Sequence, residues 1–339
     1  MVADLKLLQA GVSELGIGLT REQLSAFSIY MDELMKWNQR ANLTAIATPD
    51  GIQTRHFLDS LTCLLGFPVE QPTTVNSMAP LSDVAERLNG GEGLSCLDVG
   101  TGAGFPGIPL KIFLPRMKLT LLESIAKKTA FLTNLVDLLG PEDTTVITGR
   151  AEELARQPDH RERYDVVVTR AVSKLAVVAE LTLPFCRIGA RSIALKKGEH
   201  MAQEIEESRY AVRQLGGQYA EEVAVKLSLL DEGRMVIVLE KVSSTHAAYP
   251  RRPGMPAKRP LLAPGSTKQD VQDRLGYTSH SPKVDAEQRC QGGGYQQDGQ
   301  HDQGNRGCPG DGVAEPAVGV LAHDAAIAGY AYGEHQHHR

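Results

Sequence analysis

The chain has 339 residues, of which 42% are hydrophobic and 23% are charged, as in globular proteins, and its formal net charge is −5. No apolar run reaches bilayer length and the first residues lack the pattern of a secretory signal, so we expect a cytoplasmic protein without membrane contact. Five widely separated cysteines with no CxxC pair favour neither a zinc site nor a disulfide framework, and no metal is expected.

The charge is unevenly distributed along the chain. Residues 262–339 hold six Lys or Arg against ten Asp or Glu, which leaves residues 1–261 nearly neutral. A nearly neutral body can still bind nucleic acid where its basic residues cluster, because affinity follows the local potential. Net charge therefore does not exclude an RNA-binding function.

Residues 1–93 are predicted to form an N-terminal helical region with a loop insertion. Apolar and aromatic residues recur at helical spacing, and Thr20 is placed as an N-cap before them. We expect this stripe to be helix core rather than a platform for stacked bases; it comprises Leu24, Phe27, Tyr30, Leu34 and Trp37. Another amphipathic stretch begins at His56, and breakers across 67–93 indicate a loop or a weak helix.

Residues 94–245 alternate between strand and helix patterns. Candidate strands are Ser95–Val99, 119–123, 145–148, 165–169, 191–196 and 235–240, with helical runs such as 127–139 and 175–184 between them. This alternation predicts an α/β domain with a mainly parallel, twisted sheet and helices on both faces. Such sheets bind ligands outside the carboxyl ends of their strands.

The C-terminal part consists of two segments that differ in amino-acid composition. Residues 246–261 form a basic, proline-rich segment, and we expect its run 250–260 to be extended and able to lie along phosphates. Residues 262–339 contain thirteen glycines and few large apolar residues, so they are expected to be disordered. The terminal histidines are interpreted as solvated side chains rather than metal ligands.

A glycine-rich loop follows the first predicted strand. Gly100, Gly102 and Gly104 give the spacing G-x-G-x-G, and Phe105 occupies the third glycine position of a dinucleotide fingerprint. Together with Asp98, two residues before the first glycine, this loop looks like the first motif of class I methyltransferases.

Two further features follow in order along the sheet. Glu123 ends the second strand, where an acid can accept hydrogen bonds from ribose hydroxyls. Ala151 and Glu152 follow the third strand, where an adenine ring would lie. Each alone has an ordinary explanation, a solvated carboxylate or the first turn of a helix. The glycine-rich loop, Glu123 and the pair Ala151 and Glu152 together favour a nucleoside-containing cofactor.

With these motifs the chain resembles the RsmG (GidB) family of bacterial 16S ribosomal RNA guanine-N7 methyltransferases, across about residues 20–261. The matching segments are 42–44, 55–56, 59–60, 98–107, 121–124, 127–128, 150–152, 169–171, 197–198 and 249–261. The chain departs from the family in a long insertion across 69–93 and in the tail after residue 261.

The resemblance implies S-adenosylmethionine as cofactor and one guanine of the small-subunit RNA, free or within the 30S subunit, as target. The cofactor site that follows from it and from the loop comprises Asp98, Gly100, Gly102, Gly104, Phe105, Glu123, Ala151, Glu152 and Arg170. We expect the protein to be a monomer.

The chemistry of guanine N7 suits the residues present. N7 carries a lone pair and no proton, so methyl transfer needs alignment rather than a general base. The sequence holds no Asn/Asp-Pro-Pro-Tyr motif and no cysteine pair suited to attack on a pyrimidine. Arg170, at the end of the fourth strand, is the predicted catalytic residue, placed to hold the methionine carboxylate or an RNA phosphate. His56 either meets RNA or packs against the sheet.

RNA contacts are predicted for basic residues at or beyond strand ends and in the proline-rich segment. These are Arg55, Lys127, Lys128, Lys196, Lys197, Arg251, Arg252, Lys258 and Arg259. Three alternatives remain open: a nicotinamide-dependent oxidoreductase, disfavoured by Phe105; a methyltransferase of small molecules; and a non-catalytic RNA-binding assembly protein.

Overall fold

The computed structural model describes residues 4–68, 81, 93–170, 173–198, 200–231 and 233–264. Within these residues no helix is both long and apolar enough to cross a membrane. Residues 262–339 are predicted to be disordered, and all of them except 262–264 lie outside the described residues. The 69–93 insertion also lies outside them, apart from residues 81 and 93.

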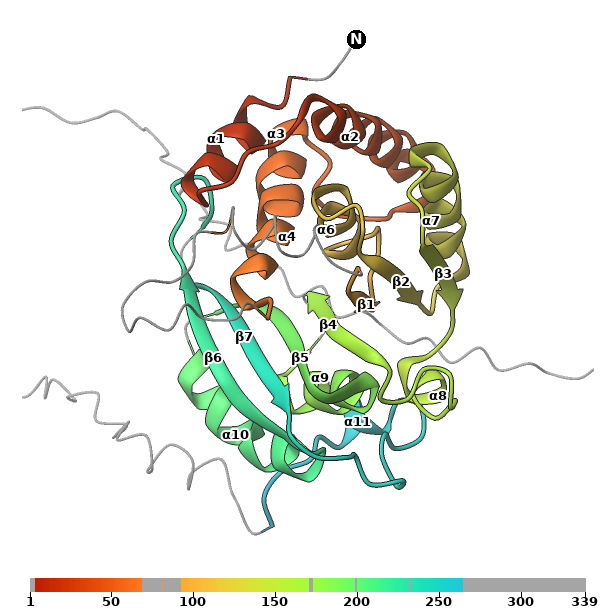
Figure 1. Ribbon diagram of the computed structural model, residues 1–339, viewed down its shortest axis with the longest axis vertical. Coiled ribbons are helices and arrows are strands. Elements are labelled where there is room, and N and C mark those ends of the chain that lie inside the picture. Colours follow the sequence, from red (N-terminus) through yellow and green to blue (C-terminus); the bar gives the residue numbers. More distant parts are fainter. Residues whose placement is uncertain are drawn as a thin grey trace, which may run out of the picture. The chain divides into compact units, whose positions relative to one another are not determined.

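A seven-stranded sheet runs through the centre of the fold (Figure 1). Its strands are β1 Ser95–Val99, β2 Lys118–Glu123, β3 Thr144–Thr148, β4 Tyr164–Arg170, β5 Cys186–Lys197, β6 Gly217–Val225 and β7 Arg234–Lys241. The strand order is β3-β2-β1-β4-β5-β7-β6. Strands β1 to β5 pair in parallel, and β7 is antiparallel to both β5 and β6. The predicted mainly parallel sheet is therefore confirmed.

Strand order reverses between β1 and β4, because β2 and β3 lie on one side of this pair and β5 on the other. In open α/β sheets the crevice outside the carboxyl ends of the strands at such a reversal is where ligands bind. The glycine-rich loop leaves β1 and Arg170 ends β4, so both flank this point.

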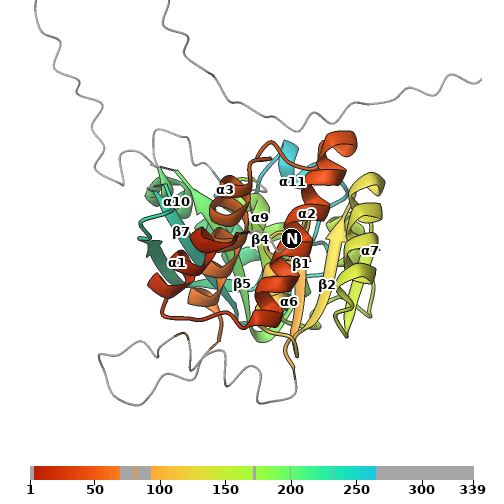
Figure 2. The ribbon, with the colours of Figure 1, turned by 90° about the horizontal axis from the view of Figure 1, so that it is seen from above.

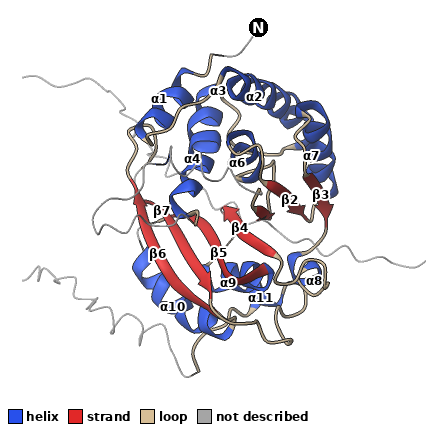
Figure 3. Cartoon of the chain, in the orientation of Figure 1, coloured by secondary structure: helices blue, strands red, loops and turns tan. Residues whose placement is uncertain are grey.

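Helices cover both faces of the sheet, as predicted (Figure 3). They are α6 Gly107–Phe113 and α7 Ala126–Leu139 with the N-terminal helices on one face, and α8 Ala151–Leu154, α9 Leu175–Thr182, α10 Met201–Gln214 and α11 Met255–Lys258 on the other. The alternation along β4 shows the two sides: Val166 and Val168 join the core beneath the N-terminal helices, whereas Val167 joins the core beneath α8. The central strand β4 is thus buried on both faces.

The N-terminal helices are α1 Lys6–Glu14 and α2 Arg21–Ala41, which lie over the sheet in Figure 2. Thr20 caps α2 as predicted, since its hydroxyl accepts from the Gln23 amide at 3.2 Å while the Gln23 side chain accepts from the Thr20 amide at 2.9 Å. The predicted stripe is core: Phe27, Tyr30 and Leu34 have no exposed surface.

A further helical run covers residues 49–66 and changes geometry along its length. It begins with the single turn α3 Pro49–Gly51, continues as a π-helical stretch Ile52–Leu58, returns to α geometry in α4 Asp59–Leu61 and ends in the tighter turn Thr62–Gly66. π-Helical turns are rare and are frequently found at functional sites. Gly66 lies so close to the sheet that an added Cβ would be 2.8 Å from Val238, so this run packs directly on β7.

The sequence predictions need two corrections. Strand β6 was not predicted, because it is an edge strand whose exposed residues, among them Glu222, interrupt the apolar pattern. The run 250–260 is not extended throughout: its chain turns at Gly254 and forms the helical turn α11, in whose first turn Pro256 is tolerated.

The N-terminal helices and the sheet share one hydrophobic core cluster, which contains Leu8 and Phe57 as well as Val166 and Val238. The domain boundaries predicted at residues 93, 245 and 261 stay predictions, and the first of them adjoins the segment outside the described residues.

Candidate active site

The loop after β1 is a tight backbone turn at the carboxyl end of the sheet. Gly100, Gly102 and Gly104 have φ values of +70°, +62° and +100°. The amides of Gly100 and Thr101 donate to the Leu122 carbonyl at 2.9 and 3.1 Å, which anchors the loop to β2. A Cβ at Gly102 would meet nothing closer than 4.0 Å, so the loop surface there is open to a ligand.

Asp98 fixes the loop from below. Its fully buried Oδ2 accepts from the Thr101 hydroxyl at 2.6 Å and from the Gly107 amide at 2.7 Å. Burial raises the pKa of Asp98 to about 7, although these two hydrogen bonds act in the opposite direction. Its Oδ1 is buried with no hydrogen-bond partner among the described residues, so an acceptor remains available beneath the loop.

Glu123 ends β2 beside the loop and is 6% exposed. Oε2 accepts from the Gly102 amide at 3.0 Å and Oε1 from the Ile125 amide at 2.9 Å. A carboxylate has about four acceptor positions. Oε1 also accepts from the Ser124 hydroxyl at 3.4 Å, so it is Oε2 that keeps capacity for a further donor such as a ribose hydroxyl. The open Gly102, the orphaned Asp98 oxygen and Glu123 together fit the nucleoside and sulfonium ends of S-adenosylmethionine.

Ala151 and Glu152 begin α8 after β3, and both are buried. The Glu152 Oε1 atom accepts from the Gly254 amide at 2.9 Å. The segment before α11 is therefore attached to the helix that the sequence assigns to the adenine region.

Gly104 and Phe105 turn away from the open loop surface. A Cβ on Gly104 would lie 2.7 Å from the Tyr30 hydroxyl, and that hydroxyl donates to the Ala103 carbonyl at 2.5 Å. The Phe105 ring is buried and stacks on His56 and Tyr30, with centroid distances of 4.3 and 5.3 Å. These two residues, predicted as cofactor contacts, join the loop to the N-terminal helices.

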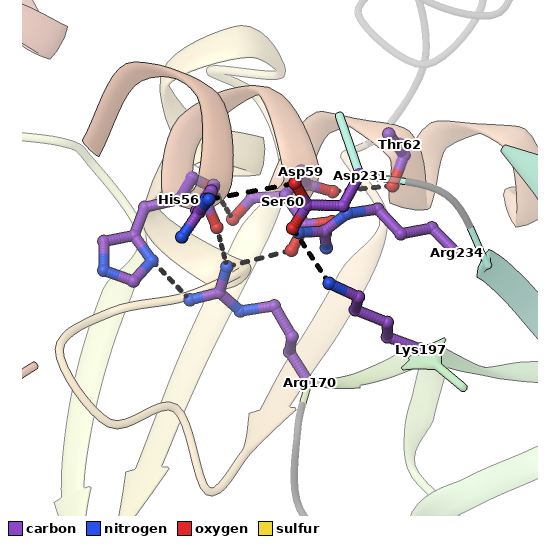
Figure 4. A network of polar contacts seen from close by, with 9 residues as sticks. His56, Asp59, Ser60, Thr62, Arg170, Lys197, Asp231 and Arg234 are labelled. Atoms are coloured by element: carbon purple, nitrogen blue, oxygen red, sulfur yellow. Dashed lines mark hydrogen bonds and ion pairs between the residues drawn. The ribbon is translucent and has the colours of Figure 1, made fainter. Parts of the chain in front are cut away.

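Arg170 extends from the end of β4 into the helical run 49–66 (Figure 4). Its Nη1 donates to the Arg55 carbonyl at 2.8 Å and to Asp59 Oδ2 at 3.1 Å, and its Nη2 donates to His56 Nδ1 at 3.0 Å. Its guanidinium carbon also lies 4.8 Å from the centre of the Phe105 ring. The predicted catalytic arginine is thus held firmly by the N-terminal region.

These contacts determine the tautomer of the His56 ring. Arginine can only donate, so His56 Nδ1 must accept, and Nε2 carries the proton that is donated to the Thr44 hydroxyl at 2.8 Å. Burial, with Arg170 and Arg234 nearby, lowers the pKa of His56 to about 3. The ring is neutral at physiological pH, which favours the packing interpretation over a charged RNA contact.

Sequence reasoning missed two residues of this network. Asp59 is buried, and its two oxygens accept from Arg170 and from Arg234, the first residue of β7. The Arg234 Nε atom is buried without an acceptor among the described residues. Asp59 belongs to a matched motif, yet nothing in the sequence indicates that residues 175 positions apart would pair.

A pocket of about 520 Å³ opens beside this network. Its lining comes from the helical run and from the ends of β4, β5 and β7, with Leu195 among the apolar residues. The basic residues that line it are Arg55, Arg170, Lys196, Lys197 and Arg234. Arg170, which lines the pocket, also contacts the ring of Phe105 and so connects the pocket to the glycine-rich loop.

The remaining predicted RNA contacts are dispersed. Lys127 is exposed at the start of α7, and the Lys128 ammonium lies 4.0 Å from Glu123 Oε2. Arg251 forms a forked ion pair with the fully buried Glu180 of α9, at distances down to 2.6 Å. Arg252, Lys258 and Arg259 are exposed on and beside α11. Arg251 is accordingly a structural anchor, and its prediction as an RNA contact has no geometric support.

The strand order, the glycine-rich loop after β1 and the acid that ends β2 define a class I S-adenosylmethionine-dependent methyltransferase. Residues 23–229 match the family model GidB, described as rRNA small subunit methyltransferase G. The chain belongs to this family.

Curated relatives agree with the family model. A protein of Dehalococcoides mccartyi is 43% identical over 252 residues, 74% of this chain and 97% of its own length. Others from Roseiflexus castenholzii and Alkaliphilus metalliredigens are 44% and 38% identical, covering 73% and 75% of this chain and 95% and 98% of their own lengths. All three are named ribosomal RNA small subunit methyltransferase G.

Proposed function

We propose that this protein transfers a methyl group from S-adenosylmethionine to N7 of one guanine in the 16S ribosomal RNA of the small subunit, in the cytoplasm. The observation that carries the proposal is the meeting, at the reversal of strand order, of an open glycine-rich loop and a pocket lined by five basic side chains. Membership of the family supports ribosomal RNA as the substrate class.

S-Adenosylmethionine supplies an electrophilic methyl group on a positively charged sulfur. The chain's own residues supply alignment. Glu123 accepts from the ribose, the Gly102 surface lets the ligand approach the backbone, and Asp98 holds the loop in shape. Because N7 has no proton to lose, a neutral His56 that acts as neither acid nor base is compatible with this chemistry.

The charge of the pocket favours RNA over small-molecule substrates. The pocket lining holds five cations and the carboxylate Asp59, and two further carboxylates, Glu204 and Asp231, pair with three of these cations, so positive charge is in excess. Such a surface suits a polyanion and would repel other cations. We therefore favour the RNA over a small molecule, and a catalytic role over a purely structural one, because the buried Asp98 and the loop glycines that a cofactor requires are all present.

The test measures cofactor binding and methyl transfer on the same variants. Gly100→Asp places a carboxylate and a side chain at φ +70°, so it should abolish S-adenosylmethionine binding measured by calorimetry. Arg170→Ala should retain cofactor binding within several-fold and lose transfer to 30S subunits. Equal cofactor binding by wild type and Gly100→Asp would contradict the placement of the cofactor on this loop.

A further inference from the structure

The ends of three adjacent strands place cations around one pocket. Arg170 ends β4, Lys196 and Lys197 end β5, and Arg234 begins β7 directly opposite Lys197 in the antiparallel register. Arg55 from the helical run completes the set. Apart from the adjacent Lys196 and Lys197, these side chains are far apart in sequence and meet because the three strands are neighbours and the helical run lies over their ends.

Nearby carboxylates neutralise this set only partly. Asp59 pairs with Arg170 and Arg234, Glu204 lies 2.7 Å from Lys196, and Asp231 lies 2.8 Å from Lys197. Asp231 also lies 3.8 Å from Arg55. Three carboxylates thus face five cations, so the pocket keeps an excess of positive charge. His56 adds none, because it is neutral.

We propose that this pocket binds the RNA backbone phosphates that flank the target nucleotide, an inference that rests on the proposed function. Asp59 holds Arg170 and Arg234 side by side as positioned donors. Lys197 and Arg55 stand at the mouth, each 53% exposed, and their shared partner Asp231 is itself on the surface. A phosphate can replace Asp231 at little cost, because exposed ion pairs contribute little.

Two features set the pocket apart from ordinary basic surface. Arg234 Nε has no acceptor among the residues described, and leaving a buried donor unpaired is unfavourable. An entering phosphate oxygen would provide that acceptor. Arg170, which lines the pocket, also contacts Phe105 of the glycine-rich loop, so a phosphate bound by Arg170 would lie near the loop that we propose holds the methyl donor.

The experiment uses the full chain with Lys197→Gln, Arg55→Gln and the double variant, and Arg187→Gln as a matched control. Arg187 lies at the opposite end of the same strand β5, is 55% exposed and pairs with one carboxylate, Asp165. Binding to unmethylated 30S subunits is measured across a salt series, and S-adenosylmethionine binding is measured by calorimetry.

Each pocket variant should weaken 30S binding about tenfold and reduce the slope of log K against log salt by about 0.7–0.9. Cofactor affinity should stay within twofold of wild type, and Arg187→Gln should match wild type in both. Arg234→Lys, which keeps the charge beside Asp59, should fold normally and weaken 30S binding less than Arg234→Gln.

Each of the following outcomes would overturn the inference. Unchanged salt slopes in the pocket variants would show that no phosphate binds there, and weakened cofactor binding would assign the pocket to the methionine carboxylate instead. If the wild-type chain binds no 30S subunits, the proposed function fails together with the inference. If wild type binds and methylates while the pocket variants behave like the control, only the inference fails.

Discussion

Gly102 and Gly104 share a loop and a positive φ but have different surroundings. Ala at Gly102 meets open space, whereas Ala at Gly104 would press on the Tyr30 hydroxyl and on Ile108 at 2.7 and 2.9 Å. Gly102→Ala should therefore cost about 1–2 kcal/mol of unfolding free energy and weaken S-adenosylmethionine binding strongly. Gly104→Ala should cost about 2–4 kcal/mol.

Chemical denaturation and calorimetry measure both quantities for each variant. If Gly104→Ala were as stable as Gly102→Ala, the close approach of α2 to the loop would be wrong. If Gly102→Ala bound the cofactor as wild type does, the loop surface would not be the binding surface.

The lowered pKa of His56 predicts a specific loss of folding stability in acid. Its pKa is about 3 in the folded protein and about 6.5 when unfolded, so the unfolded chain binds the extra proton between these values. Stability from this group is complete above pH 6.5 and decreases as the pH falls towards 3, by about 2 kcal/mol at pH 5. Urea unfolding of wild type and His56→Gln at pH 7.5 and pH 5 measures the difference.

Asp98 acts in the opposite direction within part of this range, because its raised pKa of about 7 adds stability as the pH falls from 7 towards 4. It is present in both proteins, so the comparison isolates His56. An equal change on acidification in wild type and His56→Gln would contradict a buried, neutral imidazole.

At the scale of elements, the segment 245–258 is hydrogen-bonded at several points to α8 and to the loop between α8 and β4. Arg161 donates to the Thr245 and Tyr249 carbonyls, and Arg156 donates to the Pro250 carbonyl at 2.5 Å. Gly254 then donates to Glu152. This segment thereby holds α8, which carries the predicted adenine contacts, against α9.

Arg251→Gln should consequently destabilise the fold rather than merely weaken RNA binding. It would leave Glu180, which has no exposed surface, as a buried charge without its ion-pair partner, and losses of about 3–5 kcal/mol are typical. Thermal unfolding of this variant beside Arg187→Gln, whose ion pair is exposed, measures the difference. Wild-type stability with weakened RNA binding would restore Arg251 as an RNA contact.

Most strands were predictable because buried parallel strands read as apolar runs, and β1, β2 and β4 differ from their predicted bounds by no more than one residue at either end. Edge strand β6 was not predicted, because charged residues interrupt its apolar alternation. Its pairing with β7 is also irregular between Tyr219 and Glu221. Turn α11 was missed because prolines suggested extended chain. The loop motif was recognisable from local sequence, whereas the pairing of Asp59 with Arg234 depends on tertiary packing that no spacing encodes.

At the scale of the molecule, the N-terminal helices and the sheet act together at the site. Asp59 and His56 hold Arg170, and Phe105 stacks between His56 and Tyr30.

Asp59→Asn keeps the shape of the side chain but removes the charge that orients two arginines. We expect it to raise KM for 30S subunits at least about tenfold while cofactor affinity stays near wild type; steady-state kinetics at two salt concentrations measure this. An unchanged KM would show that Asp59 has only a structural role.

The most direct test of the central claim is transfer of labelled methyl from S-adenosylmethionine to 30S subunits that lack the modification, followed by nuclease mapping of the RNA. We predict label as 7-methylguanosine at a single position of the 16S RNA, reduced strongly by Arg170→Ala. Label on another atom or on many guanines, or no RNA label despite cofactor binding, would contradict it.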